Sequence, residues 1–305
     1  MKEHAPIVVG IDDSDAAPRA IAFSREFAAA LDAPCRLVHA VRSPWASAPA
    51  PDGARAALME AAAVDAARVH IKNALKDEAP AALLNTMDVR VGRASVELSQ
   101  AAAEANAQLI VIGGKRHSTF GRWFGSSTGH GLARVSDRPV LVAGPSTGPV
   151  RRVLAAVDFS DTGHIVLATA ERYARALNAQ LRVVSVVEPL PVTPGVVTII
   201  DGDEYYRWAE SQLAADMWPR ITYPATDKVV RIGHPVEVLL RELTDWAADL
   251  VVVGSQGKNV VERALLGSVS ESLLNQLPTT LLLVPPMRPV TLRAPAYASQ
   301  LAGAL

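Results

Sequence analysis

The sequence predicts an α/β protein made of two tandem Rossmann-like domains, each an open five-stranded parallel sheet with helices on both faces. Three observations support this fold class. Short β-branched runs alternate with longer helical stretches, which is typical of a parallel sheet with crossover helices. The runs are almost continuously apolar, as in strands that are covered on both faces. Similar segments also return in the second half of the chain, which indicates a duplicated domain.

The duplication is visible in three pairs of segments, 146 residues apart in the first pair and 141 in the other two. The pairs are IVVGIDDSD at 7–15 with VLAAVDFSD at 153–161, VRVGRASVE at 89–97 with VRIGHPVE at 230–237, and LIVIG at 109–113 with LVVVG at 250–254. Pro, Gly and Ser cluster between the copies, at 144–152, as in linkers. The predicted domains are therefore residues 1–146 and 151–286, followed by a C-terminal tail, 287–305.

The elements follow the same order in both copies. The apolar runs predict strands, and the alanine-rich or amphipathic stretches between them predict helices. In the first copy these are strand 6–11, helix 15–31, strand 36–41, helix 54–79, strand 87–91, helix 95–105, strand 109–112, helix 127–135 and strand 140–143. In the second copy they are strand 152–157, helix 162–177, strand 180–187, helix 203–218, strand 228–232, helix 236–246, strand 250–253, helix 268–276 and strand 280–284. A proline-rich insertion, 188–202, is read as a surface loop, with a flap over the site or a partner-contacting arm as alternatives.

Composition limits the function classes. The 305 residues carry a formal net charge of −1, so no basic excess draws nucleic acid or an anionic membrane. The single cysteine, Cys35, excludes an internal disulfide and suits a reducing compartment. No signal peptide or membrane-spanning run is recognised, so we expect a cytoplasmic protein.

The usual catalytic and nucleotide motifs are not found. The sequence has neither G-x-x-x-x-G-K-[ST] nor a complete G-x-G-x-x-G. The G-x-S-x-G match at 125–129 follows its strand by more than ten residues, whereas a nucleophile elbow follows its strand directly. The histidines lack metal-ligand spacing. No catalytic residue and no metal ligand set are therefore predicted.

The most informative stretch is 250–270, LVVVGSQGKNVVERALLGSVS. It reads as a buried strand, a glycine-punctuated loop and the start of a helix. Such an arrangement presents backbone N–H groups to a phosphate, and the helix N-terminus favours negative charge. The alternative is that the glycines only permit turns and tight packing.

With this stretch, the second copy resembles the universal stress protein family, whose ATP-binding members carry G-x2-G-x9-G-[ST] after the fourth strand. Gly254, Gly257, Gly267 and Ser268 match that pattern in full. Asp158 matches the aspartate that ends the first strand in the family. The resemblance extends over both copies, so the whole chain resembles a tandem universal stress protein.

The resemblance implies an ATP site in the second domain, with Mg²⁺ as a possible companion. It implies contacts of Asp158 with the ribose or the phosphate region and of the main chain near Val186 with the adenine. Gly254 and Gly257 would line the ribose and phosphates. The implied phosphate cradle consists of Gly267, Ser268, Val269 and Ser270.

The first copy departs from this pattern. Asp12 matches the strand-end aspartate, and Gly113, Gly125 and Ser126 match the outer positions, but Arg116 replaces the inner glycine and one residue is missing. One hypothesis is a degenerate, structural first domain. The other is an anion site formed by Asp12, Lys115, Arg116, Gly125 and Ser126, because ammonium and guanidinium groups bind phosphate well.

The resemblance implies a regulatory or protective stress protein that binds ATP and hydrolyses it weakly or not at all. Two alternatives stay open, a nucleotide-free protein-interaction module and a slow ATPase. Single-domain members of the family commonly dimerise through their last strands. The resemblance therefore implies that the last strands of the two copies, 140–143 and 280–284, pair within the chain, with a further homodimer possible.

Overall fold

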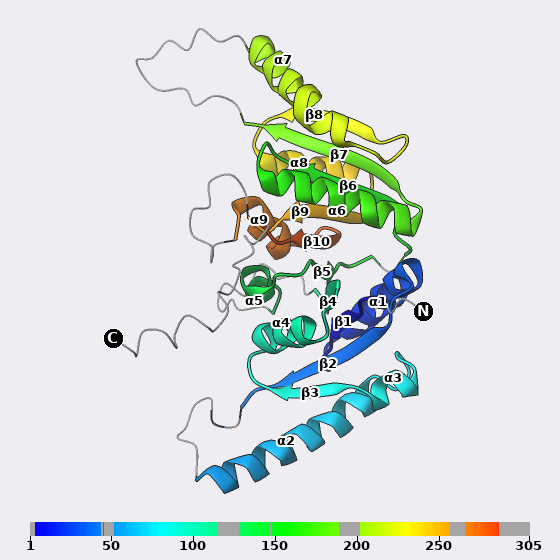
Figure 1. Ribbon diagram of the computed structural model, residues 1–305, viewed down its shortest axis with the longest axis vertical. Coiled ribbons are helices and arrows are strands. Elements are labelled where there is room, and N and C mark those ends of the chain that lie inside the picture. Colours follow the sequence, from blue (N-terminus) through cyan, green and yellow to red (C-terminus); the bar gives the residue numbers. More distant parts are fainter. Residues whose placement is uncertain are drawn as a thin grey trace, which may run out of the picture.

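All the described strands join one ten-stranded sheet, in the order β3-β2-β1-β4-β5-β10-β9-β6-β7-β8. The computed structural model describes residues 4–43, 45, 52–114, 128–146, 148–188, 202–256 and 266–286. The strands follow one another along the long axis of the molecule, with the N-terminal copy at one end and the C-terminal copy at the other (Figure 1). Each copy therefore has the predicted five parallel strands in the order 3-2-1-4-5.

The elements of the first copy occur in the predicted order. They are β1 (Ile7–Gly10), α1 (Ala17–Leu31), β2 (Cys35–Val41), α2 (Gly53–Ala74), α3 (Ala81–Asn85), β3 (Asp88–Val91), α4 (Ala94–Glu104), β4 (Leu109–Gly113), α5 (Thr128–Val135) and β5 (Val140–Ala143). The predicted helix 54–79 was wrong at its end, since α2 stops at Ala74 and a separate short helix, α3, begins after Pro80. Proline at the N-terminal boundary favours a new helix start over continuation of the old helix.

The second copy repeats this order. Its elements are β6 (Arg152–Val157), α6 (Asp161–Leu177), β7 (Gln180–Val187), α7 (Gly202–Gln212), β8 (Asp227–Ile232), α8 (Pro235–Asp245), β9 (Leu250–Gly254), α9 (Ser268–Gln276) and β10 (Thr280–Val284). The predicted single helix 203–218 is divided. It continues after Gln212 as a π-helical turn, Leu213–Met217, and a 3-10 turn, Trp218–Arg220. Pro219 lacks the N–H that a further α-helical turn requires.

The two copies are joined by their last strands, as expected from the sequence. β5 and β10 pair antiparallel, with Leu282 opposite Leu141. The other neighbouring strands that the structure describes all pair parallel. The hydrophobic core consequently runs through the joint, because buried residues of both copies belong to the same two clusters.

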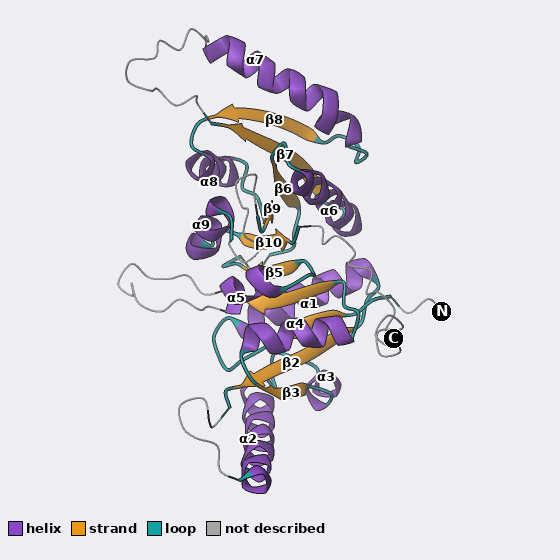
Figure 2. Ribbon diagram, turned by 60° about the vertical axis from the view of Figure 1, so that its left-hand side comes forward, coloured by secondary structure: helices purple, strands orange, loops and turns teal. Residues whose placement is uncertain are grey.

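Helices cover both faces of the sheet. Residues of α1, α2, α6 and α7 pack on one face with β1, β6 and β10, while residues of α4, α5, α8 and α9 pack on the other. Figure 2 shows α6 on one side of the second-copy strands and α8 and α9 on the opposite side. This two-sided cover explains the near-continuous apolar strands.

Phe27 of α1 and Tyr173 of α6 connect the copies on the first of these faces. Their ring centroids lie 5.4 Å apart at a tilt of 50°, and both residues are fully buried. The Tyr173 hydroxyl has no hydrogen-bond partner among the described residues. Burial raises the pKa of Tyr173 to about 12, because the charged phenolate is disfavoured away from water.

Removing this hydroxyl should therefore not lower the free energy of unfolding. We expect Tyr173→Phe to leave the free energy of unfolding unchanged or to raise it by up to about 1 kcal/mol, since it deletes a desolvated, unpaired polar group and keeps the ring. Urea denaturation of the variant and the native chain provides the measurement. A loss above about 1 kcal/mol would mean that the hydroxyl does make a stabilising bond.

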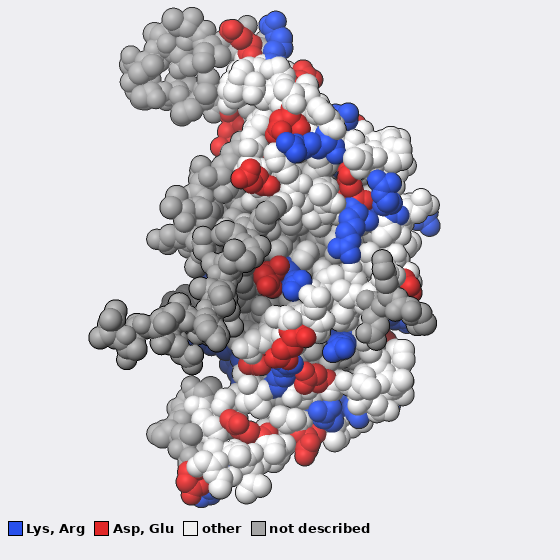
Figure 3. All heavy atoms as spheres, in the orientation of Figure 1, with Lys and Arg blue, Asp and Glu red and all other residues white. Residues whose placement is uncertain are grey.

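Charged side chains of both signs are interspersed over the described surface seen in Figure 3, as the formal net charge of −1 leads one to expect. Within the described ranges, no helix is both long enough and apolar enough to cross a membrane.

Candidate functional site

A cleft of about 400 Å³ opens at the carboxyl end of the second-copy strands. It lies where β6 and β9 are neighbours and their following helices, α6 and α9, leave toward opposite faces of the sheet. Open α/β sheets bind ligands at such a switch point. Seven sequence-predicted residues line the cleft: Asp158, Val186, Gly254, Gly267, Ser268, Val269 and Ser270. The eighth, Gly257, lies outside the described residues.

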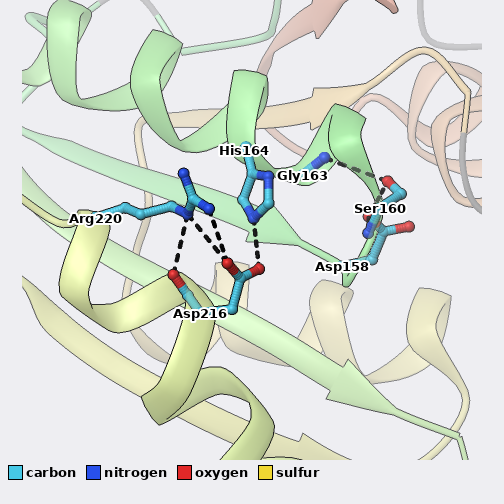
Figure 4. Close-up of polar contacts among 6 residues, drawn as sticks. All are labelled: Asp158, Ser160, Gly163, His164, Asp216 and Arg220. Carbon is cyan, nitrogen blue, oxygen red and sulfur yellow. Dashed lines mark hydrogen bonds and ion pairs between the residues drawn. The ribbon is translucent and has the colours of Figure 1, made fainter.

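The loop after β6 holds Asp158 at the floor of the cleft. The Ser160 backbone N–H donates to Asp158 Oδ1 at 3.1 Å, and the Ser160 hydroxyl donates to the same oxygen. The same hydroxyl oxygen caps α6 by accepting from the Gly163 N–H at 3.3 Å (Figure 4). A Cβ at position 163 would lie 2.2 Å from the Asp158 carbonyl oxygen, so the turn requires glycine there. The carboxylate is thereby held in place through one oxygen.

The end of β9 and the start of α9 form the next wall. A Cβ at Gly254 would lie 2.7 Å from Thr162 Cγ2, so this glycine allows α6 to approach the strand. The Ser270 hydroxyl donates to the Gly254 carbonyl oxygen, and the Gly267 N–H donates to the Ser255 carbonyl oxygen at 2.9 Å. These bonds fix the N-terminus of α9 against the strand that precedes the loop.

The first turn of α9 faces the cleft with backbone donors. Its N-cap is Gly267, which has no side chain to accept from the amides of the turn. Ser268, Val269 and Ser270, the first three residues of the helix, all line the cleft. An anionic group is favoured at such a position by both the free N–H groups and the helix dipole.

The end of β7 supplies a backbone carbonyl group to the cleft. The pairing of β7 with β6 ends at Ser185, but β7 continues to Val187 beside β8. The Val187 carbonyl accepts from the Gly233 N–H at 3.1 Å, on the β8 side. Backbone groups alternate between the two sides of a strand, so those of Val186 face β6. The parallel Val157–Ser185 pairing uses the Val186 N–H, which leaves the Val186 C=O past the end of β6, toward the cleft.

Fifteen other residues line the cleft and were not predicted as site residues, and five of them form two of its walls. Phe159, Tyr205 and Trp208 are aromatic, and Pro235 and Leu239 belong to the start of α8. The aromatic pair of α7 had a sequence signal, a three-residue spacing that places Tyr205 and Trp208 on one helical face. Only the fold shows that this face meets the cleft.

A polar contact ties the turn after α7 to α6. His164 Nε2 lies 2.7 Å from Asp216 Oδ2, and the Arg220 guanidinium donates to Asp216 Oδ1 at 2.9 Å (Figure 4). Hydrogen bonds from Arg220 and then His164 lower the pKa of Asp216, so this carboxylate is ionised at neutral pH. The contact holds the π-helical turn close to the loop that carries Asp158.

The first copy has a related but different arrangement. Asp12 follows β1 and accepts from the Ser14 N–H at 3.1 Å, as Asp158 does from Ser160. Arg19 of α1 donates to the Gly114 carbonyl oxygen at 2.8 Å, a contact that no motif indicated. The other residues of the predicted anion site, Lys115, Arg116, Gly125 and Ser126, lie outside the described residues.

The described residues include no cluster of three or more His, Cys, Asp or Glu side chains arranged to hold a metal ion. Among the described residues, the carboxylates that line the cleft are those of Asp158 and Glu188. Cys35 is half-buried rather than fully buried, and burial raises the pKa of its thiol. It lies at the start of β2, in the other copy.

The fold and the cleft together define a duplicated α/β protein with a cleft at a strand switch point. The family model of the universal stress protein family matches this chain twice, at residues 4–144 and 149–285. The chain therefore belongs to the universal stress protein family.

Relatives and solved structures agree with this membership. A universal stress protein of Mycobacterium tuberculosis H37Rv is 31% identical over 296 residues, covering 88% of this chain and 92% of the relative. One from Mycolicibacterium smegmatis is 27% identical, covering 92% and 97%. The crystal structure of a universal stress protein from Archaeoglobus fulgidus has a TM-score of 0.62 at 17% identity, covering 93% and 99%. The fold and the tandem arrangement are thus shared across nearly the whole chain.

Proposed function

We propose that this universal stress protein binds ATP in the second-copy cleft and acts in a stress response as a regulatory or protective protein. One observation carries the proposal. A single cleft brings together a strand-end aspartate, the Val186 carbonyl at the end of β7 and the uncapped N-terminus of α9. These groups suit a ribose, a base and a phosphate chain, in that order.

The proposed contacts follow from the donors and acceptors present. The Asp158 carboxylate accepts from ribose hydroxyls, and the backbone of Val186 pairs with the polar edge of the adenine. The amides of Ser268, Val269 and Ser270 donate to phosphate oxygens. Oxygen ligands suit Mg²⁺, so Asp158 and the phosphates are the proposed ligands if the nucleotide is bound with this ion.

ATP should stabilise the protein against heat if it binds only the folded chain. At an ATP concentration 100 times the dissociation constant, the gain is about 2.7 kcal/mol. That gain corresponds to a Tm rise of several degrees, at about 2–4 °C per kcal/mol for chains of this size class. Differential scanning fluorimetry with and without ATP and Mg²⁺ measures it. An unchanged Tm at millimolar ATP would favour a nucleotide-free interaction module.

Steady hydrolysis is the second outcome to be tested. Among the described lining residues there is no histidine, and the carboxylates are those of Asp158 and Glu188. We therefore propose binding without turnover. Phosphate release well above background that is lost in Asp158→Ala would establish the slow ATPase instead.

We propose a single nucleotide site, in the second copy, and a structural role for the first. Because β5 and β10 pair within the chain, neither last strand needs a second chain as a partner. A homodimer through another surface is compatible with this pairing. A cytoplasmic setting is proposed, in keeping with the nucleotide ligand and the free thiol of Cys35.

A further inference from the structure

Three aromatic side chains form one wall of the cleft, beyond the groups discussed above. Phe159 follows Asp158 directly, and Tyr205 and Trp208 come from α7. The rings of Tyr205 and Trp208 are stacked, with centroids 5.7 Å apart and planes 11° from parallel. Phe159 and Trp208 lie 6.5 Å apart at a tilt of 39°. The three rings therefore form a continuous aromatic surface, which we call the aromatic wall.

Trp208 stands at the open side of this wall. It lines the cleft and yet retains 52% of its surface exposed, whereas the next residue of α7, Ala209, is fully buried. Tyr205 is half-buried and packs against the core, which anchors the stack. An indole held in position in this way, with surface left uncovered, is suited to receive another flat ring.

The opposite wall of the cleft is aliphatic. Pro235 and Leu239 come from α8, which packs on the other face of the sheet from α7. Val184 and Val186 of β7 lie between the two walls. A flat heteroaromatic ring that enters between α7 and α8 thus meets aromatic surface on one side and aliphatic surface on the other, next to the backbone of Val186.

We propose that Trp208 is a specificity-determining residue that stacks on the nucleobase and makes the site prefer purine over pyrimidine nucleotides. This inference rests on the proposed nucleotide site and names the part of the ligand that α7 recognises. The larger purine ring offers more overlap to the indole. An aromatic side chain can stack on any base, and modest base preferences come from differences in stacking strength.

The first copy has a polar contact at the corresponding place, which supports a specialised role for the aromatic wall. Asp13 occupies the position of Phe159 after the strand-end aspartate, and α2 occupies the position of α7. His70 Nε2 of α2 lies 3.1 Å from Asp13 Oδ2, and this bond lowers the pKa of Asp13. A hydrogen bond between two exposed side chains occupies this position in the first copy, whereas rings line it in the second.

The test compares ATP and CTP affinities of the full chain by calorimetry. We expect Trp208→Leu to weaken ATP binding about 5- to 100-fold and to reduce the preference for ATP over CTP. Trp208→Phe, which keeps a ring, should stay within about threefold of the native ATP affinity. Trp246→Leu is the matched control, because Trp246 ends α8 outside the cleft and should leave both affinities unchanged.

Tryptophan fluorescence gives a second measurement, which reports on the surroundings of Trp208 even if a variant is less stable. ATP should alter the tryptophan emission of the native chain, and Trp208→Phe should remove most of that change. Native ATP affinity in Trp208→Leu, or an undiminished fluorescence response in Trp208→Phe, would overturn the role of Trp208 while leaving the ATP site intact. A native chain that binds no nucleotide would instead overturn the proposed function itself.

Discussion

Replacing Gly267 by glutamate is expected to reduce ATP affinity more than about 100-fold, a loss of about 2.7 kcal/mol or more. Gly267 is the N-cap of α9 and lines the cleft. A carboxylate at this position would compete with the phosphates for the amides of Ser268, Val269 and Ser270. It would also repel the phosphates electrostatically in the partly enclosed cleft.

The same substitution should leave the apo protein folded. The backbone of Gly267 is extended, with φ −66° and ψ 147°, a conformation that any residue adopts. An acidic side chain at a helix N-terminus is mildly stabilising. Calorimetry measures the affinity, and a melting curve without ATP measures the fold. Gly148→Glu is the matched control, because a Cβ there meets nothing within 4 Å and the site lies in the connection between the copies. Equal loss of ATP affinity in both variants would contradict phosphate binding at the N-terminus of α9.

Replacing Leu282 by alanine is expected to destabilise the whole chain by about 2–5 kcal/mol. Leu282 is fully buried in β10, between Val252 of β9 and Leu141 of β5. Truncation leaves a cavity at the joint between the two copies. Because the sheet and core are continuous there, urea should unfold both copies in a single transition that moves to lower concentration.

Leu58→Ala is the control for this prediction. Leu58 lies on α2 with 72% of its surface exposed, so its truncation should change stability by less than about 0.5 kcal/mol. Intrinsic tryptophan emission and far-UV circular dichroism follow the two variants. Two separate transitions, of which Leu282→Ala moves only one, would mean that the copies fold as independent units.

The order of elements could be predicted from the sequence, because it depends on local pattern, whereas the pairing of the copies followed from the family resemblance. The run at 250–253 is apolar and β-branched, and the three repeated segment pairs support the strands that they contain. The helix ends were less predictable. The stretch after Gln212 still has a helical pattern, and its change to π and 3-10 turns depends on packing around Leu213 and Met217, which are fully buried.

The polar half of the candidate site could also be predicted, since glycine spacing and a strand-end aspartate are local signals. The aromatic wall could not. Phe159 and Trp208 are 49 residues apart, and their rings meet because α7 and the loop after β6 line the same cleft. The Arg19 contact with Gly114, across 95 residues of sequence, escaped prediction for the same reason.

The stoichiometry of ATP binding tests the central claim most directly. Titration of the intact chain with ATP and Mg²⁺ in a calorimeter should give one nucleotide per chain, bound in the second-copy cleft, and no measurable heat of binding in Gly267→Glu. A stoichiometry of two would contradict the structural role proposed for the first copy. No binding by the native chain, or native binding by Gly267→Glu, would contradict the second-copy site.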